Sequence, residues 1–417
     1  MTPSLAELTR AFARIGLLSF GGPAAQIALM HREIVDDRKW LTEKEYLSAL
    51  SFCMLLPGPE AMQLATWIGW RKHGTLGGLI AGGLFVLPGA LVILVLSMIY
   101  AAFGQVPLVS ALFAGVQAAV IAVVIEALLR VARRALKTPA HRIVAALAFA
   151  GLFLFALPFP VIILAAAVWG FATAHGAAVA GPRDPAPWGR SLRAAMVWGA
   201  VWLLPLGFLL WRGGILAEIA WFFSKLALLT FGGAYAVLAW MAQEVVAEKA
   251  WLSPAQMMDG LGLAETTPGP LILVTEFVGY IAAHAAGGWT LGLAGALTAL
   301  WMTFAPCFLW IFAGAPWIDR LTAAPRLAGA LQGITAAVVG VIAHLALWFA
   351  AHVLFAAQIA LDAGPLAVTV PDPFSLRLDA ALVTALSGVL LLWRHWNLFA
   401  VLAVAAASTA ALALLWP

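Results

Sequence analysis

The stretch Leu18-Ser19-Phe20-Gly21-Gly22-Pro23 decides the fold, because the chain contains it twice. Adding 211 to each number gives Leu229-Thr230-Phe231-Gly232-Gly233-Ala234, and the same offset continues without a gap on both sides. It aligns Pro57-Gly58-Pro59 with Pro268-Gly269-Pro270 and Trp40-Leu41 with Trp251-Leu252. A register this long indicates an internal duplication, which must be interpreted before any single motif.

The composition predicts an integral membrane protein. Hydrophobic residues make up 64% of the 417 residues, charged residues only 10%, and the mean hydropathy is +0.99. A soluble domain carries about 25% charged residues. The net charge of +4 comes from basic residues in short loops, where cytoplasmic retention explains them better than nucleic-acid binding. The two cysteines, Cys53 and Cys307, are far apart and indicate neither a disulfide nor a metal site.

Each half of the chain contains six hydrophobic segments, which we expect to be helices. In the first half they cover about 5–31, 45–70, 75–103, 107–130, 142–157 and 160–179. In the second half they cover about 216–242, 255–283, 289–314, 327–355, 379–393 and 397–416. We therefore predict an all-α membrane protein with a first repeat (1–180), a basic linker and connecting transmembrane helix (181–212) and a second repeat (213–417).

Loop charges predict that the two repeats have opposite orientations. The loop after the fourth segment of the first half holds only basic charges, at Arg130, Arg133, Arg134, Lys137 and Arg142. Its counterpart in the second half holds Asp362, Asp372 and Asp379 against one Arg377. Basic loops stay in the cytoplasm, so the first loop is predicted inside and the second outside. Inverted repeats of this kind recur in transporters, with the substrate site at their interface.

The charged loop 31–44 leaves two topologies open. If all thirteen segments, six in each half and the connecting helix, span the membrane, this loop lies outside. It holds four basic and four acidic residues beside His31. If the first two segments of each half are re-entrant hairpins broken at their glycines, the loop lies in the cytoplasm. The inverted relation of the halves is the same in both cases.

The duplicated glycines and prolines predict broken helices. Gly21-Gly22-Pro23 interrupts an apolar segment, and a broken helix directs backbone N–H groups and its positive dipole end into a cavity, which favours an anion. Close packing of small residues is the alternative explanation. The two prolines of Pro57-Gly58-Pro59, and of Pro268-Gly269-Pro270, mark a second break in each half, with a plain kink as the alternative.

Charged and polar residues near these breaks are candidates for the site. Arg14 and Lys225 lie seven residues before Gly21 and Gly232, so two helical turns place each cation on the glycine face. A cation at the bilayer centre costs about 2.5–3.5 kcal/mol and is a functional candidate, although Arg14 could instead extend to the interface. Near the breaks, Gln26 and Gln63 are polar, and Glu60, Glu265 and Glu276 could carry a coupling proton.

These residues resemble the chromate ion transporter family of bacterial inner membranes, in its long two-domain form. The resemblance is carried by Phe20-Gly21-Gly22-Pro23, by Trp40-Leu41 and by the run Cys53-Met54-Leu55-Leu56-Pro57-Gly58-Pro59-Glu60-Ala61-Met62-Gln63, with partial copies at Phe231-Gly232-Gly233 and Thr267-Pro268-Gly269-Pro270. It implies a multi-pass inner-membrane protein that exports chromate, with sulfate as the similar anion. Ala234 replaces the second proline after Gly-Gly, so the halves need not contribute equally.

We predict a secondary transporter that exports chromate by alternating access and confers chromate resistance. A sulfate or other oxyanion transporter, or an anion channel, is the alternative. A membrane enzyme would need a clustered acid-base set, and we find none in the sequence. The expected partners are the chromate or sulfate anion, the lipid bilayer and, as an open alternative, a second copy of the chain in a homodimer; we expect no nucleic acid, cofactor, metal or catalytic residue. The predicted substrate-binding residues are Arg14, Gly21, Gly22, Pro23, Gln26, Pro57, Gly58, Pro59, Gln63, Lys225, Gly232, Gly233, Pro268, Gly269 and Pro270, and the coupling candidates are Glu60, Glu265 and Glu276.

Overall fold

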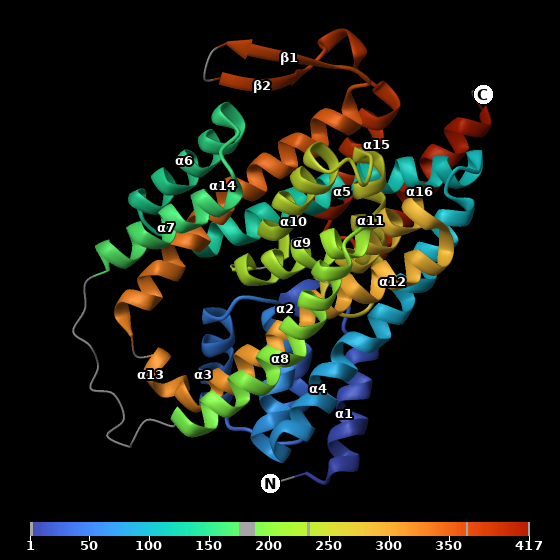
Figure 1. Ribbon diagram of the computed structural model, residues 1–417. Helices are drawn as coiled ribbons and strands as arrows, with labels where there is room; N and C mark the ends of the chain where they lie inside the picture. The colour runs from blue at the N-terminus through green and yellow to red at the C-terminus, as the bar shows by residue number, and fades with distance from the viewer. Residues whose placement is uncertain (1–2, 175–187, 232–233, 323, 364–365, 416–417) are drawn as a thin grey trace. The chain divides into compact units, whose positions relative to one another are not determined.

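The computed structural model describes residues 3–174, 188–231, 234–322, 324–363 and 366–415, and its regular structure is almost entirely helical (Figure 1). The first half contains α1 (Leu5–Leu18), α2 (Gly22–His31), η1 (Arg32–Asp37), α3 (Glu43–Leu55), α4 (Glu60–Phe103), α5 (Pro107–Ala135), α6 (Pro139–Phe155) and α7 (Phe159–Thr173). The connecting helix is α8 (Trp188–Arg212).

The second half repeats this order. It contains α9 (Ile215–Leu229), α10 (Ala234–Ala242), η2 (Gln243–Glu248), α11 (Pro254–Thr266), η3 (Leu271–Leu273), α12 (Val274–Gly314), η4 (Ala315–Trp317), α13 (Ile318–Thr322), α14 (Pro325–Leu354), β1 (Gln358–Ala363), β2 (Leu366–Pro371), η5 (Pro373–Ser375), α15 (Leu378–Gly388), η6 (Val389–Trp393) and α16 (Leu398–Leu415). Several helix ends differ by 211: α1 and α9 end at Leu18 and Leu229, and the π-helical turns η1 and η2 cover equivalent residues.

The helices confirm the membrane class. Five helical stretches in the described part of the chain are long and apolar enough to cross a membrane: Glu60–Phe103, Pro107–Ala135, Trp188–Arg212, Leu271–Trp317 and Pro325–Leu354. A span of the hydrocarbon core needs about 20 residues. The chain is therefore a multi-pass, helical membrane protein.

Two of these stretches are helical hairpins. The backbone of α4 leaves helical geometry at His73 and Gly74, and that of α12 does so at Gly287 and Gly288. A Cβ added to Gly69 would lie 2.1 Å from the carbonyl oxygen of Gly77. Residues eight apart in a straight helix are about 12 Å apart, so the two arms of α4 fold back on each other. Glycine permits this close approach of two backbones.

A short β-hairpin was not predicted from the sequence. Strands β1 and β2 pair antiparallel, with Gln358 opposite Pro371 and Ala363 opposite Leu366. The hairpin occupies the acidic loop between α14 and α15 (Figure 1). The run Ala367-Val368-Thr369-Val370 is rich in β-branched residues, which favour strands, but the search for long apolar segments did not detect it.

The chain forms two compact units, and each contains parts of both predicted repeats. Unit 1 comprises Met1–Met98, Phe171–Val237 and Leu263–Leu331, and unit 2 comprises Ile99–Gly170, Leu238–Gly262 and Gln332–Pro417. Within unit 1, α12 packs on α8 and α9. Within unit 2, α5 packs on α15 and α16. Gly340 and Gly333 bring α14 against backbone carbonyls of α6 and α7 in the same unit.

Ion pairs hold the charged segment between α2 and α3 in unit 1. The buried carboxylate of Glu33 lies 3.4 Å from Arg14 Nε and 3.2 Å from Arg38 Nη2. His31 Nε2 lies 2.5 Å from Glu43 Oε2, and His31 Nδ1 lies 3.4 Å from Asp36 Oδ2. The imidazole therefore joins the end of α2 to the start of α3.

This His31 contact is expected to make stability depend on pH. The hydrogen bond to Glu43 raises the pKa of His31 above its ordinary value, with the charges of Glu43 and Asp36 adding to the effect and burial opposing it. The stabilisation is therefore complete below the unfolded-state pKa of about 6.5 and is lost as pH rises through the higher folded-state pKa. We expect His31→Gln to lower the thermal midpoint at acidic pH and to match wild type at alkaline pH. The exposed His395→Gln is the control; a difference that grows with pH would contradict the prediction.

Candidate functional site

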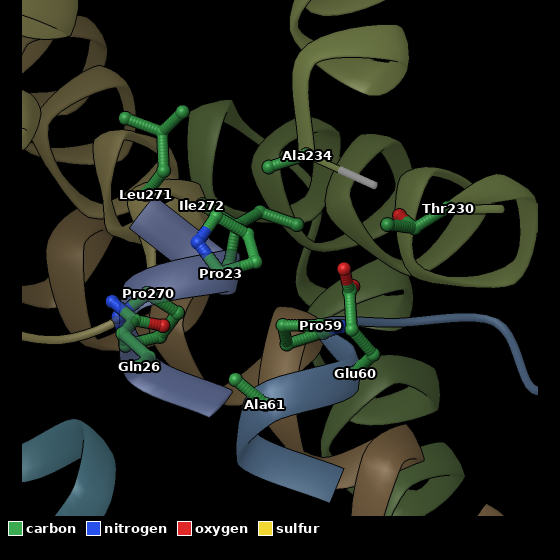
Figure 2. Close-up of a pocket in the computed structure, with 10 residues that line it drawn as sticks. All are labelled: Pro23, Gln26, Pro59, Glu60, Ala61, Thr230, Ala234, Pro270, Leu271 and Ile272. Carbon is green, nitrogen blue, oxygen red and sulfur yellow. The ribbon is translucent and has the colours of Figure 1, made fainter. Parts of the chain in front are cut away.

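Four helical segments of unit 1 begin at one small cavity (Figure 2). Its lining residues are Pro23, Gln26, Pro59, Glu60, Ala61, Thr230, Ala234, Pro270, Leu271 and Ile272. Most of them lie at or just before the starts of α2, α4, α10 and η3, whereas Thr230 directly follows the end of α9. The first residues of a helix have backbone N–H groups without an intrahelical partner. Four sets of such donors are therefore gathered around the cavity.

Most of the lining consists of equivalent residues from the two predicted repeats. Adding 211 to Pro23, Pro59, Glu60 and Ala61 gives Ala234, Pro270, Leu271 and Ile272, and all eight line the cavity. Equivalent residues of two copies meet in pairs only near an axis that relates the copies. The cavity therefore lies where the two copies of the duplicated sequence meet.

The backbone around the cavity is joined by two equivalent hydrogen bonds. Gly58 N donates to the carbonyl oxygen of Thr230 at 2.7 Å, and Gly269 N donates to that of Ser19 at 2.8 Å. Gly58 is equivalent to Gly269, and Ser19 to Thr230. Each Pro-Gly-Pro turn is thus bonded to the opposite copy, and the exchange is reciprocal.

The geometry at Gly21 favours an anion. Gly21 has φ +86° and precedes α2, where no side chain among the described residues caps the helix. Pro23 follows in the first turn, a position where proline is favoured. The partial positive charge of a helix N-terminus attracts anions, and here several such ends meet at one cavity.

Two polar side chains of the first repeat reach the cavity. Gln26 is 1% exposed, and its Nε2 donates to Gly269 O at 2.6 Å and to Ser19 O at 3.3 Å. Glu60, at the start of α4, is half-buried, and Figure 2 shows its carboxyl pointing toward Ala234 and Thr230. Their equivalents in the second repeat, Val237 and Leu271, are apolar. The site is therefore chemically asymmetric.

The structure does not bring the two predicted cations to the cavity. The Arg14 side chain is 62% exposed and pairs with Glu33. Lys225 is half-buried, and its Nζ lies 5.9 Å from the ring centroid of Trp221. Neither is among the described residues that line the cavity. Among the described residues, the features at the cavity that would attract an anion are therefore the helix N-termini.

The other predicted residues surround the cavity or lie farther away. Gln63 is buried, and its Nε2 donates to Pro57 O at 2.6 Å, which closes the turn before α4. Pro268 and Gly269 pack against Gly89 of α4. Glu265 accepts a hydrogen bond from Tyr235. Glu276 is buried on α12, and Gly22 (φ +78°) starts α2. Gly232 and Gly233 lie outside the described residues.

Sequence reasoning missed half of the lining. Ala61, Thr230, Ala234, Leu271 and Ile272 were not among the predicted site residues, and most of them carry no polar group. The duplication contained the signal, since shifting the predicted residues Pro23 and Glu60 by 211 gives Ala234 and Leu271. Ser19 and Thr230 are another equivalent pair. The hydroxyl of each donates to the carbonyl oxygen four residues earlier, at 2.6 Å in both copies.

Gln26→Leu should weaken the site by leaving a buried carbonyl without its donor. Gly269 O accepts the Gln26 amide at 2.6 Å, and an unsatisfied buried polar group costs about 1–3 kcal/mol. We expect a lower thermal midpoint and reduced anion transport, measured on the same purified preparation. The partly exposed Gln243→Leu, outside the cavity, is the control. A Gln26→Leu variant with wild-type stability would show that this bond is dispensable.

The chain is similar to known proteins over most of its length. A family model described as chromate transporter matches residues 6–171 and 217–411. A chromate transport protein of Cupriavidus metallidurans is 33% identical over 346 residues, covering 82% of this chain and 81% of the relative. One of Pseudomonas aeruginosa is 34% identical over 355 residues, covering 81% and 79%. An uncharacterized transporter of Methanocaldococcus jannaschii is 26% identical, covering 84% and 85%. No solved structure matches the chain.

Proposed function

The chain belongs to the chromate transporter family, and we propose that it exports chromate from the cytoplasm by alternating access and so confers chromate resistance. The observation that carries the proposal is the cavity lined by equivalent residues of both copies, with four helical segments starting around it. Helix N-termini bind oxyanions through backbone N–H groups. A tetrahedral dianion accepts hydrogen bonds in several directions, which suits donors that come from several helices.

An inverted relation of the two repeats, 1–180 and 213–417, is part of this proposal. The reciprocal bonds from Gly58 to Thr230 and from Gly269 to Ser19 support it, because copies related by translation would not exchange contacts in this way. The opposite loop charges support it independently. In transporters with inverted repeats, alternating access proceeds by rocking of one part against the other around a fixed site.

We favour the re-entrant topology for the first two segments of each half. Helices α1, α2 and α3 contain 14, 10 and 13 residues, fewer than the roughly 20 needed to span. The first arm of α4 ends at His73, where the helix folds back. Broken helices at membrane depth are tolerated where they line a cavity, and Gly21 and Pro59 stand at or beside this one.

The membrane potential supports export as the direction. With about 100 mV, interior negative, each charge contributes about 2.3 kcal/mol, so a dianion leaves the cell downhill by about 4.6 kcal/mol. Export therefore needs no coupling ion. Uptake of the same dianion would need co-transported cations, and Glu60, Glu265 and Glu276 are our candidates for carrying a proton in that case. Arg14 and Lys225 stay predictions as substrate-binding residues.

The alternatives make different demands on the same cavity. Sulfate has the same charge and shape as chromate, so backbone donors alone separate the two anions poorly. An anion channel would conduct without a saturable exchange of substrate, whereas a transporter shows counterflow. We also propose the bacterial inner membrane as the location, which the basic loops support. Formation of a homodimer stays a prediction.

Transport by inside-out membrane vesicles tests the proposal. We expect radiolabelled chromate to enter such vesicles, to exchange with unlabelled chromate in counterflow, and to slow when an ionophore collapses the potential. Sulfate in excess is expected to compete. Vesicles that lack the protein are the control. Absence of protein-dependent chromate entry would refute the proposal, and entry of sulfate alone would replace chromate as the substrate.

A further inference from the structure

A buried carboxyl group in unit 2 lies among neutral hydrogen-bond donors. Asp259 of α11 is 4% exposed. Tyr100, near the end of α4, donates its hydroxyl to Asp259 Oδ2 at 2.7 Å, and Gln117 Nε2 of α5 donates to Asp259 Oδ1 at 2.8 Å. We call Asp259, Tyr100 and Gln117 the Asp259 cluster. None of the three lines the cavity of unit 1.

Local packing explains why these three side chains meet. A Cβ on Gly262 would lie 2.2 Å from Val116 Cγ1, so α11 and α5 approach closely one turn from Asp259 and beside Gln117. The ring of Tyr100 packs edge-on against Phe113 of α5, with ring centroids 5.1 Å apart. Gly262 and the aromatic pair thus hold the carboxyl between two donors.

The charges around the cluster do not neutralise Asp259. No cation is among the described contacts of its carboxyl group, and the titratable group that touches it is the Tyr100 phenol. On α5 the nearest charges are Glu126 and Arg130, which pair with each other. On α11 the other carboxyl, that of Glu265, bonds Tyr235. A buried carboxylate that only neutral groups contact is costly, so uptake of a proton is the available way to remove the charge.

Gln117 gives the cluster two complete hydrogen-bond arrangements. With Asp259 ionised, the amide nitrogen of Gln117 donates to Oδ1, as observed. With Oδ1 protonated, the amide can rotate so that its oxygen accepts the new proton, while Tyr100 continues to donate to Oδ2. Both states satisfy the carboxyl group without any movement of the backbone. Ionisable residues inside membrane proteins commonly mark proton relays.

We propose that the Asp259 cluster is a proton-binding site, in which Asp259 takes a proton from water, holds it at Oδ1 and returns it to water during the transport cycle. Tyr100 and Gln117 are its positioning residues. No bond other than O–H forms or breaks, and no electrons are transferred. The link to transport rests on the proposed function, whereas proton binding itself does not.

Infrared difference spectra of the purified protein test proton binding directly. An acid-minus-alkaline spectrum is expected to contain the C=O band of a protonated, buried carboxyl group. This band should be absent from Asp259→Asn and shifted in Tyr100→Phe, which removes one hydroxyl and keeps the ring. Glu126→Gln, which alters a carboxyl that has a cation partner in the same unit, should keep the band. An unchanged band in Asp259→Asn would overturn the proposal, and so would a band displaced by sodium ions, which would indicate a cation site.

Transport at varied pH tests the link to the cycle. The wild-type rate is expected to change about tenfold per pH unit where Asp259 titrates, and that of Asp259→Asn by less than about twofold. If the carboxyl is purely structural, Asp259→Asn will lower the rate equally at every pH, which would overturn the role of proton binding in the transport cycle. If Asp259→Asn does not fold, Tyr100→Phe is expected to displace the pH profile instead. Failure of chromate transport in wild type would refute the proposed function but leave the infrared result valid.

Discussion

Gly58→Ala is expected to abolish chromate transport while the protein still inserts in the membrane. Gly58 has φ +122°, a conformation that residues with a Cβ rarely adopt. Its Cβ would lie 2.7 Å from Gln63 Nε2 and 2.8 Å from Cys307 Sγ, both fully buried. The strained backbone costs about 1–3 kcal/mol and overpacking a similar amount. Relief would come from movement of the turn, which breaks the bond from Gly58 N to Thr230 O.

Movement of this turn acts directly on the cavity. Pro59 and Glu60 follow Gly58 and line the cavity, and the first-turn N–H groups of α4 move with them. A displacement of about 1 Å at a preorganised site can lower a rate about a hundredfold. Gly269→Ala, at the equivalent position with φ +91°, should act in the same way but less strongly. Its Cβ would lie 3.1 Å from a flexible leucine side chain, that of Leu273, so the crowding is milder.

Two control glycines separate strain from crowding. Gly74→Ala places an alanine where φ is already +60°, with open space around its Cβ. Gly83→Ala adds neither backbone strain nor crowding. We expect vesicle transport to fall in the order Gly83→Ala, Gly74→Ala, Gly269→Ala, Gly58→Ala. Transport rates must be normalised to the amount of protein in the membrane. Transport by Gly58→Ala equal to that of Gly83→Ala would show that the turn does not shape the site.

The duplication made much of this site predictable. The register of 211 singles out Gly21 and Pro57-Gly58-Pro59, because glycine and proline act on the backbone locally, and in the structure one helix ends and the next begins at each. The apolar segments predicted the helices for the same reason, since hydrophobic length reports on the membrane. Several of the predicted residues, Pro23, Gln26, Pro59, Glu60 and Pro270, line one cavity.

The partners of these residues could not be predicted. Gln26 bonds Gly269, which is 243 positions away, and no local pattern specifies such a pair. Helical spacing placed Arg14 on the glycine face, but a long side chain bonds what lies nearby, here Glu33 of η1. Asp259 belongs to no sequence motif. Its two donors, Tyr100 and Gln117, are evident only from the structure, in which Gly262 lets α11 pack closely on α5.

The first copy contributes the amide and carboxyl side chains of the cavity. The sequence suggested this inequality from Pro23, which Ala234 replaces in the second copy. In the structure, Gln26 and Glu60 also line the cavity, and their equivalents in the second copy, Val237 and Leu271, are apolar. Helix N-termini from both copies would attract an anion, whereas the carboxyl of Glu60 would repel it and so favour its release. Glu60 is therefore the residue whose charge should control affinity.

Glu60→Gln is expected to strengthen chromate binding and to flatten its dependence on pH. An ionised carboxylate about 5 Å from a dianion, at an effective dielectric constant of about 20, opposes binding by about 7 kcal/mol before screening. Gln keeps the shape of the side chain and removes the charge. We expect at least about a tenfold lower Kd at the pH where Glu60 is ionised, equivalent to about 1.4 kcal/mol. Binding of radiolabelled chromate to purified protein measures this.

The same variant is expected to release chromate more slowly than wild type. If the charge of Glu60 helps to expel the dianion after the cavity opens outward, Glu60→Gln will bind tightly and transport slowly in vesicles. The exposed Glu248→Gln is the control, since it changes the net charge equally but lies in η2. Raising the pH should weaken binding to wild type and leave the variant unchanged. Equal affinities at every pH would show that the carboxyl does not face the bound anion, and weaker binding by the variant would make the carboxyl a ligand instead of a repulsive charge.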